Sequence, residues 1–479
     1  MQIRQIILFA VIVMMCLPGC VSEQSHYVRY LHKYMSEEDE RTYKPEFWEE
    51  NVAKALEIRD RTDRDYPKKY FKHFVLPVRV AGEPLDRFRM VYADTLCNLV
   101  KGMNPERAAL AINTWCRKQA TYMDGWKKTQ SAMGTVEYGY GLCSDLTVLV
   151  INALRAAGFP AREVVTTWAD YRSNHAWVEV YVNGRWAMMG SAEPFPQLDM
   201  NAWKNHRRVM CAEIDVIGDY HGPETVLSRN GKMTRISNLS GYVPVKKAEV
   251  SVYDSLGRPA RGASVQFLMY HEGGLHTLVS ATTGIRGGTV VELGMGDVVA
   301  FAYKDGLFGM AKVSGSQDEA GLILRHSITG NSAAEFELSP PQKNPEWGHV
   351  EPDIESWTQL DSVRKTRLEA HPADEARVQS FIDEPRRGHL PEVSWPVMGR
   401  TRLDVNTNDS IAWGRELSIY KVEDGSLVDV SYPYVPSGRY IAVTGTERLE
   451  NYTYKVRIET FSIPDGLPEF NVPVSMPSL

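Results

Sequence analysis

The fold of this chain is decided by Gly-Leu-Cys-Ser-Asp at residues 141–145 and by the run Leu-Thr-Val-Leu-Val-Ile-Asn-Ala-Leu-Arg-Ala-Ala-Gly-Phe-Pro that follows at 146–160. Apolar residues recur at helical spacing in this run, and the closing Gly-Phe-Pro is a typical helix stop. The pattern predicts a helix over residues 144–157, with Cys143 at its start. Unpaired N–H groups and the positive end of the helix dipole favour a thiolate at such a position. We therefore expect Cys143 to be a reactive thiol.

Three strands are predicted after this helix. Residues 162–167 are rich in β-branched side chains, and residues 175–182 alternate between two faces. An Asn-Gly pair then predicts a tight hairpin and a return strand over residues 185–189. His175 opens the middle strand, and Glu193 follows the end of the return strand. A thiol, an imidazole and a carboxylate in this order suit nucleophilic catalysis, because the imidazole removes the thiol proton and the acid fixes its tautomer.

These motifs resemble the core of the transglutaminase-like superfamily. The resemblance rests on the Cys143 motif, on Gly-Phe-Pro-Ala-Arg at residues 158–162 and on Asn-His-Ala-Trp-Val-Glu-Val-Tyr-Val-Asn-Gly-Arg-Trp at 174–186. It covers roughly residues 104–199. The superfamily includes transglutaminases, peptide N-glycanases and bacterial cysteine proteases. The resemblance implies a papain-like fold with a Cys-His-Asp triad, in which Cys143 is the nucleophile and His175 the base.

The third member of the triad departs from the family pattern. Gly190 stands where the family usually has the aspartate of an Asp-Pro pair. Glu193, which is followed by a proline, is the expected substitute, and Asp199 is the alternative.

Further residues are candidates for the oxyanion hole and the substrate cleft. Acyl transfer needs hydrogen-bond donors aimed at the developing oxyanion, and the backbone N–H of Cys143 is one candidate. Gln130 is the candidate for the second donor, with a solvated loop glutamine as the alternative. The residues expected to line or rim the cleft are Trp168, Asp170, Asn174 and Trp177. The alternative for the loop before His175 is that its aromatic residue merely packs.

The N-terminus has the pattern of a secretion signal. Arg4, an apolar run over residues 6–17 and Leu-Pro-Gly-Cys at 17–20 make up this pattern. Its ending resembles a bacterial lipoprotein signal, which implies that Cys20 becomes the lipidated first residue; the alternative is an ordinary signal peptide with an incidental cysteine. The expected location is the bacterial cell envelope, in the outer membrane and facing the periplasm or the cell surface, with acyl chains as the anchor.

Composition restricts the partners of the protein. The 479-residue chain has a formal net charge of −6 and no basic patch with interleaved aromatic residues, so no nucleic acid partner is expected. Cys97, Cys116 and Cys211 show neither CxxC nor zinc-ligand spacing, and they are expected as free thiols or as a source of one disulfide. No Ca²⁺-binding loop is present in the sequence. Neither a metal nor a cofactor is expected, and the oligomeric state stays open.

The expected architecture is α+β with appended β-sandwich domains. Six segments are distinguished: a signal peptide at 1–20, a helical lead-in at 21–103, the transglutaminase-like domain at 104–221, a β-sandwich at 222–338, a connector at 339–396 and a second β-sandwich at 397–479. The first sandwich resembles the prealbumin-type, carboxypeptidase-regulatory-like modules of secreted bacterial enzymes. The connector is rich in proline and charge and is predicted to hold one helix over residues 354–369.

Together these features favour a cell-envelope cysteine hydrolase that acts on amide bonds of peptides or glycopeptides. Water is the expected acyl acceptor, because hydrolysis needs no second bound nucleophile. One alternative is a catalytically inactive fold that binds protein or glycan. Another is peptide N-glycanase-like cleavage or cross-linking acyl transfer. The β-sandwiches are expected as spacers, with sugar or protein binding as the alternative.

Overall fold

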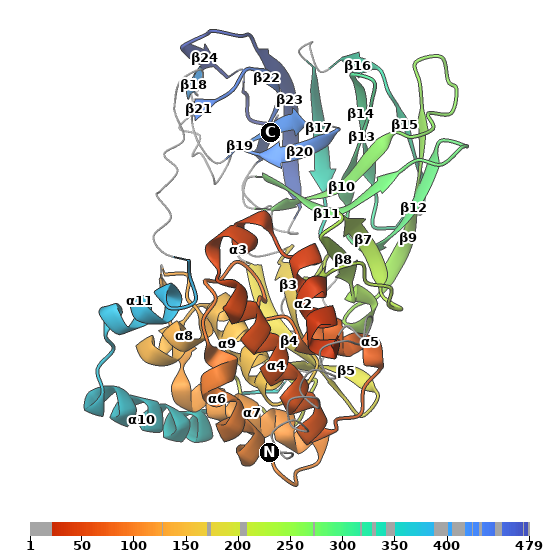
Figure 1. The fold of residues 1–479 in the computed structure, drawn as a ribbon. Coiled ribbons are helices and arrows are strands. Elements are labelled where there is room, and N and C mark those ends of the chain that lie inside the picture. The colour runs from red at the N-terminus through yellow and green to blue at the C-terminus, as the bar shows by residue number, and fades with distance from the viewer. Residues whose placement is uncertain are drawn as a thin grey trace, which may run out of the picture.

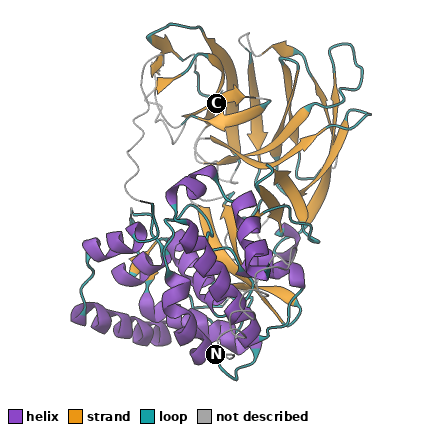
Figure 2. Cartoon of the chain, viewed as in Figure 1, coloured by secondary structure: helices purple, strands orange, loops and turns teal. Residues whose placement is uncertain are grey.

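The structure of the chain is a computed structural model that describes residues 22–126, 128–169, 174–201, 208–271, 274–316, 319–327, 332–341, 350–387, 401–404, 417–423, 425–430, 434–445, 453–472 and 474–477. It confirms the α+β class: helices, a six-stranded sheet and a two-stranded sheet form the N-terminal part, and the C-terminal part is rich in sheets (Figures 1 and 2). Among these residues, none of the helices combines the length and the apolar character needed to cross a membrane. The expected signal segment with Cys20 lies outside the described residues.

The lead-in is helical, as predicted. Its elements are α2 (Glu23–Tyr34), α3 (Glu37–Thr42), α4 (Pro45–Thr62), α5 (Lys68–Tyr70), the π-helix η1 (Phe71–Val75) and α6 (Phe88–Leu99). Aromatic side chains of this region, such as Phe47, Trp48 and Phe71, are buried together. They are therefore core residues and not platforms for a sugar.

The part of the chain that carries the predicted triad, which we call the catalytic unit after that prediction, combines three helices with a six-stranded antiparallel sheet and a two-stranded sheet. Its helices are α7 (Pro105–Gln119), α8 (Ala132–Tyr138) and α9 (Cys143–Ala156), and β1 (Thr121–Tyr122) pairs with β2 (Tyr140–Gly141). Six strands form a sheet in the order β5-β4-β3-β6-β8-β7. Their bounds are β3 (Ala161–Thr167), β4 (Asn174–Val182), β5 (Arg185–Met189), β6 (Glu213–Ile217), β7 (Thr225–Arg229) and β8 (Met233–Ser237), and the 3-10 helix η3 (Leu239–Gly241) follows.

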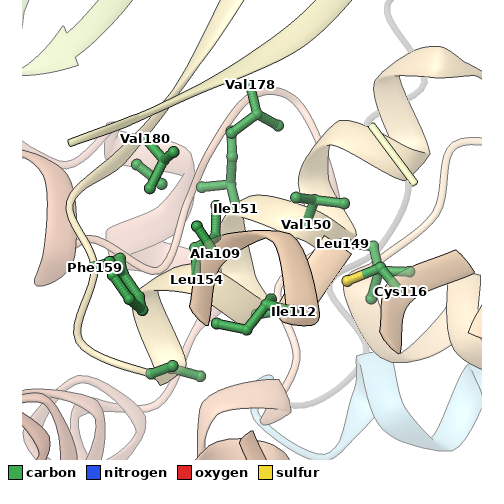
Figure 3. Packing of buried hydrophobic residues seen from close by; sticks show 14 of the residues in the cluster. Ala109, Ile112, Cys116, Leu149, Val150, Ile151, Leu154, Phe159, Val178 and Val180 are labelled. Atoms are coloured by element: carbon green, nitrogen blue, oxygen red, sulfur yellow. The ribbon is translucent and has the colours of Figure 1, made fainter. Parts of the chain in front are cut away.

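Helix α9 is the buried centre of this unit. It begins at Cys143, one residue earlier than predicted, and ends one residue earlier, before the predicted Gly-Phe-Pro stop. Leu149, Val150 and Leu154 pack between α7 and the inward-facing residues Val178 and Val180 of β4 (Figure 3). Because both sides of the helix are covered, its first residue is held firmly against the start of β4.

Aromatic residues cover the opposite face of the sheet. Trp177 of β4 lies there with Tyr70, Phe74 and Tyr242. The same face holds a buried ion pair in which Arg162 bridges Glu179 and Glu224. Both faces of the sheet are therefore covered by side chains.

The hairpin between β4 and β5 forms as predicted. Its Asn-Gly pair has positive φ angles, 51° at Asn183 and 81° at Gly184.

Two β-sandwiches follow. The first packs β11-β10-β13-β14-β16 on β12-β9-β15, and the second packs β17-β23-β22-β19-β20 on β21-β18-β24. The bounds in the first are β9 (Val245–Tyr253), β10 (Ser264–His271), β11 (Gly274–Thr282), β12 (Gly288–Gly294), β13 (Val298–Lys304), β14 (Leu307–Val313), β15 (Glu319–Ile323) and β16 (His326–Ser327). The bounds in the second are β17 (Ala333–Leu338), β18 (Thr401–Asp404), β19 (Leu417–Glu423), β20 (Ser426–Asp429), β21 (Tyr434–Val435), β22 (Gly438–Gly445), β23 (Tyr454–Ile463) and β24 (Glu469–Asn471).

Strand pairing differs from two of the expected domain boundaries. The catalytic sheet continues to Ser237, beyond residue 221, because β6, β7 and β8 extend it. Strand β17 pairs with β23 and so belongs to the second sandwich, although it precedes residue 339. In both cases the strands on the two sides of the expected boundary have similar composition. The sequence therefore does not show locally to which sheet a strand belongs.

The segment expected as a connector returns to the catalytic unit. It contains α10 (Ile354–Ala370), close to the predicted helix, and also α11 (Glu375–Asp383), which the sequence analysis did not predict. Figure 1 shows both helices beside α7 and α8, far from the sandwiches that flank them in the sequence. We call residues 353–387 the return segment. It ends with Arg387, whose backbone and side chain donate hydrogen bonds to the carbonyls of Thr42 and Tyr43.

Candidate active site

A cavity of about 840 Å³ lies at the start of α9. It is lined by residues from α7, α9, α10, the strands β3 and β4, and the loop after β5. Cys143, His175 and Glu193, the three residues predicted as a triad, all line this one cavity.

Cys143 is held where the loop becomes a helix. The carboxylate of Asp145 caps this turn, because it accepts hydrogen bonds from the backbone N–H of Leu142 at 2.9 Å and of Gln130 at 3.0 Å. The backbone N–H groups of Ala176 and Ser144 point at the sulfur and lower its pKa, but burial outweighs them and raises the pKa of Cys143 overall. Burial therefore opposes the helix-start effect that the sequence suggested, and the reactivity of Cys143 stays a prediction.

His175 is the second residue of β4 and lies opposite Thr166 of β3. Its ring stacks on Trp168, with ring centroids 5.8 Å apart and an interplanar angle of 20°. The sulfur of Cys143 contacts the N–H of Ala176, the next residue in the chain. Cys143 therefore lies against the backbone next to His175, although the two residues are far apart in the sequence.

Glu193 occupies the space of the missing family aspartate. A Cβ atom added to Gly190 would lie 2.4 Å from Oε2 of Glu193. The loop that carries this glutamate is fixed by Asn113 of α7, which accepts from the N–H of Ala192 and donates to the carbonyl of Glu193, both at 2.9 Å. Burial raises the pKa of Glu193 to about 7, opposed by the charge of Arg117.

Asp199, Trp177 and Gln130, which were also predicted as site residues, do not line the cavity. Asp199 is exposed, accepts a hydrogen bond from the N–H of Met188 and pairs with Arg185, so it does not replace Glu193. Trp177 is completely buried on the opposite sheet face and donates to the hydroxyl of Tyr242, which corrects its expected place in the cleft.

Gln130 is also placed differently from expectation. Its amide donates to the carbonyl of Tyr140 at 2.8 Å, and its side chain does not line the cavity. It is therefore a residue that fixes the loop before Cys143 and not an oxyanion donor. Trp168 and Asn174 do line the cavity, as expected, and Asp170 lies outside the described residues.

A buried acid in the cavity was not predicted. Glu163 of β3 lies opposite Val178, on the sheet face covered by α9, and lines the cavity. Burial raises its pKa to about 8. Among the described residues, no hydrogen bond reaches its carboxyl group. A charged residue between Ala161 and Val165 on the face of β3 that α9 covers was the signal that could have identified it.

The return segment forms one wall of the cavity. Trp357 of α10 lines it and donates a hydrogen bond of 3.3 Å to the carbonyl of Pro194, directly after Glu193. Arg117 of α7 lies over this indole, 4.8 Å from the ring centroid, and makes two hydrogen bonds of 2.8 Å to Asp361. The sequence analysis missed this group because its members are separated by more than two hundred residues and meet only in the folded chain.

Comparison with known proteins agrees with this geometry. Residues 95–190 match the family model described as Transglutaminase-like superfamily. This stretch of the chain is therefore similar to the transglutaminase-like superfamily, as its motifs predicted. A search of curated proteins finds no match.

Solved structures similar to the chain include three proteins. A candidate cysteine protease from Cytophaga hutchinsonii is 22% identical, over 28% of this chain and 46% of that one, with a TM-score of 0.23. A candidate protease from Parabacteroides distasonis is 9% identical, over 87% and 54%, with a TM-score of 0.20. Red sea bream transglutaminase is 11% identical, over 75% and 69%, with a TM-score of 0.19. The chain spans about half the length of the first two proteins. Overlaps this limited define no shared fold for the whole chain, and the assignment rests on the family model.

Proposed function

We propose that the protein is a cysteine hydrolase that cleaves amide bonds in peptides or glycopeptides. The observation that carries the proposal is the convergence of Cys143, His175 and Glu193 on one cavity, with the Glu193 carboxylate in the space beside Gly190. The cavity is roomy enough for several residues of a peptide, and pockets of about 300–1,000 Å³ are typical of small-ligand sites.

The chemistry follows from these three side chains. His175 takes the proton from Cys143, and the resulting thiolate attacks the amide carbonyl to form an acyl-enzyme. The imidazolium then gives its proton to the leaving amine, and water attacks the acyl group with His175 as the base. Glu193 fixes the tautomer of His175 and stabilises its charged form. The backbone N–H of Cys143 is the proposed oxyanion donor.

Location and anchoring complete the proposal. The N-terminal sequence, with Cys20 as the lipidated residue, supports a bacterial envelope protein held to a membrane by acyl chains. Peptides and glycopeptides of the envelope are then the substrates within reach.

Alkylation by iodoacetamide, mapped by mass spectrometry, tests the thiol–imidazole pair without knowledge of the substrate. Because burial raises the pKa of Cys143 and so disfavours its thiolate, its reaction near pH 7 should depend on His175. We expect His175→Ala to slow the alkylation of Cys143 by at least about tenfold. Cys97, which is half-buried and free, is the internal control whose rate should not change.

Substrate assays separate the remaining candidates. Release of peptide fragments that is lost in Cys143→Ala supports the hydrolase, whereas release of intact glycan supports peptide N-glycanase-like cleavage. A Cys143 that alkylates at the same rate with and without His175 would favour a binding protein on an inactive fold.

A further inference from the structure

A second cluster of reactive side chains lies where the catalytic unit meets the first sandwich. Glu213 is the first residue of β6, Cys211 lies two residues before it, and His276 belongs to β11. One potential ligand atom from each of the three residues lies within 4.8 Å of the other two. His276 Nε2 and Glu213 Oε1 are 2.9 Å apart. None of these residues belongs to the cavity around Cys143.

The donor set selects one class of metal ion. A thiolate, an imidazole and a carboxylate suit Zn²⁺ and related transition metals, whereas Mg²⁺ and Ca²⁺ prefer oxygen ligands throughout. Zinc bonds of about 2.0–2.3 Å place tetrahedral ligands about 3–4 Å apart. The ligand atoms of this cluster are no more than 4.8 Å apart, so small side-chain rotations bring the three atoms to bonding distance.

Residues around the cluster interact with the side chains of Cys211 and Glu213, as the residues around the ligands of a metal site usually do. The N–H of Thr167 donates to Sγ of Cys211 at 3.3 Å, an interaction that stabilises a thiolate. Arg235 lies 3.4 Å from Oε2 of Glu213 and is itself held by Asp215. The guanidinium therefore engages one carboxylate oxygen and leaves Oε1 directed at His276.

Two residues of the cluster are buried and the third is partly exposed. Cys211 is 4% and Glu213 is 8% exposed, while the side chain of His276 is 36% exposed. An ion can therefore enter beside the imidazole, and a water molecule can supply a fourth ligand there. Three protein ligands with one open position is a common arrangement for zinc.

We propose that Cys211, Glu213 and His276 form a Zn²⁺ site that ties the catalytic sheet to the first sandwich. On binding, the sulfur of Cys211 forms a bond to the metal and its proton passes to solvent, while imidazole and carboxylate bind through lone pairs. The sequence lacks a metal motif because Glu213 and His276 are 63 residues apart and lie on different domains. The site also steadies the active site, since Thr166, opposite His175, donates to the carbonyl of Cys211.

Cobalt titration of the full chain tests the site directly. The experiment uses a Cys143→Ala background, so that the catalytic thiol cannot bind the probe, and metal-free protein prepared with a chelator. We expect one Co²⁺ per chain with the absorption of a thiolate-to-cobalt charge transfer. His276→Gln and Cys211→Ser should weaken binding by more than about tenfold, and Cys97→Ser is the matched control that should bind normally.

Thermal unfolding gives an independent readout. Zn²⁺ should raise the melting temperature of the background protein but not that of the His276→Gln variant, which keeps its fold because the residue is partly exposed. The proposal is overturned if the background protein binds no Co²⁺ with thiolate character. It is equally overturned if binding persists unchanged in Cys211→Ser, because the ion then sits elsewhere.

Discussion

Glu193, the proposed orienting acid, lies where the side chain of a residue at position 190 would lie, although it is three positions further along the chain. The family aspartate would stand at Gly190, and the absence of a side chain there leaves room for the carboxylate of Glu193. Asn113 holds the loop between these two residues in the shape that this return requires. A glycine at position 190 is therefore a condition for the glutamate and not merely the loss of an acid.

Moving the acid back to its family position tests this explanation. Glu193→Ala should slow both hydrolysis and the alkylation of Cys143 near pH 7 by about 10²-fold or more, because His175 loses its orienting partner. Gly190→Asp combined with Glu193→Ala should recover part of that loss, since the deleted side chain makes room for the new one. Gly190→Asp alone should be inactive and less stable because of the steric conflict. Full activity in Glu193→Ala would exclude Glu193 as the orienting acid.

Glu163 makes stability depend on pH. Its pKa is raised from 4.5 to about 8 in the folded protein, so the unfolded chain releases this proton at lower pH than the folded one. The contribution of Glu163 to folding stability should therefore fall by up to about 1.4 kcal/mol per pH unit between about pH 4.5 and 8, and stay level above pH 8. Denaturant unfolding at pH 5 and pH 8 should show that Glu163→Gln gains stability over the wild type at the higher pH. Glu249→Gln, at an exposed position of β9, is the control that should show no such gain.

Local motifs account for the part of the site that sequence could predict. Cys143 and His175 each stand at the start of an element, and the patterns that define these elements are short and regular. Gln130 and Trp177 were misplaced because the partner of each, a backbone carbonyl and a tyrosine hydroxyl, depends on tertiary packing. Burial of Cys143, which raises its pKa, was missed for the same reason, since sequence reveals a helix start but not how deeply it is buried.

At the scale of elements, the return segment is the main departure from expectation. Helix α10 was predicted in place, but its amphipathic pattern is weak, so no apolar face indicated where it would dock. Its contacts to the catalytic unit are chiefly polar: Asp361 binds Arg117, and Arg367 donates to the carbonyls of Gln119 and Val136. Polar docking of this kind leaves little trace in hydrophobic periodicity. A segment rich in charge therefore resembled a solvated connector.

Breaking this docking should affect the site as well as stability. Asp361→Ala leaves Arg117 without its carboxylate partner, and Trp357→Ala removes the contact to the carbonyl of Pro194. Since small shifts of a catalytic group cost much rate, we expect either variant to slow Cys143 alkylation near pH 7 and hydrolysis by about tenfold to hundredfold. Lys365→Ala, on the exposed side of α10, is the matched control that should leave both rates unchanged. A lower melting temperature with normal rates would limit the return segment to a structural role.

At the scale of the whole molecule, the domains share hydrophobic cores. Ala169, Met210 and Leu227 of the catalytic unit are buried in the same cluster as the interior of the first sandwich. A second shared cluster joins the five-stranded sheets of the two sandwiches, where residues such as Phe301 meet Ile441 and Ile458. The alternating strand patterns predicted two sandwiches correctly in kind. Alternation alone does not show that one sheet of each is buried on both faces; the sign of such burial is a near-continuous apolar run like that of β13.

Shared cores predict that the two sandwiches lose structure together. Ile458 is fully buried on β23 within the second shared cluster, so Ile458→Ala should cost about 2–5 kcal/mol. Hydrogen exchange should then quicken not only in β22 and β23 but also in β10 and β13 of the first sandwich, because the cavity opens onto both sheets. Val290→Ala, at a position on β12 that is 57% exposed, is the control expected to change exchange in neither sandwich. If faster exchange stays within the second sandwich, the two modules fold independently and the cluster between them is only a contact surface. If faster exchange spreads to the first sandwich, the two sandwiches form one cooperative unit. Tyr420, whose hydroxyl hydrogen-bonds to the backbone of Leu275 in the first sandwich, is then one of the residues that couple them.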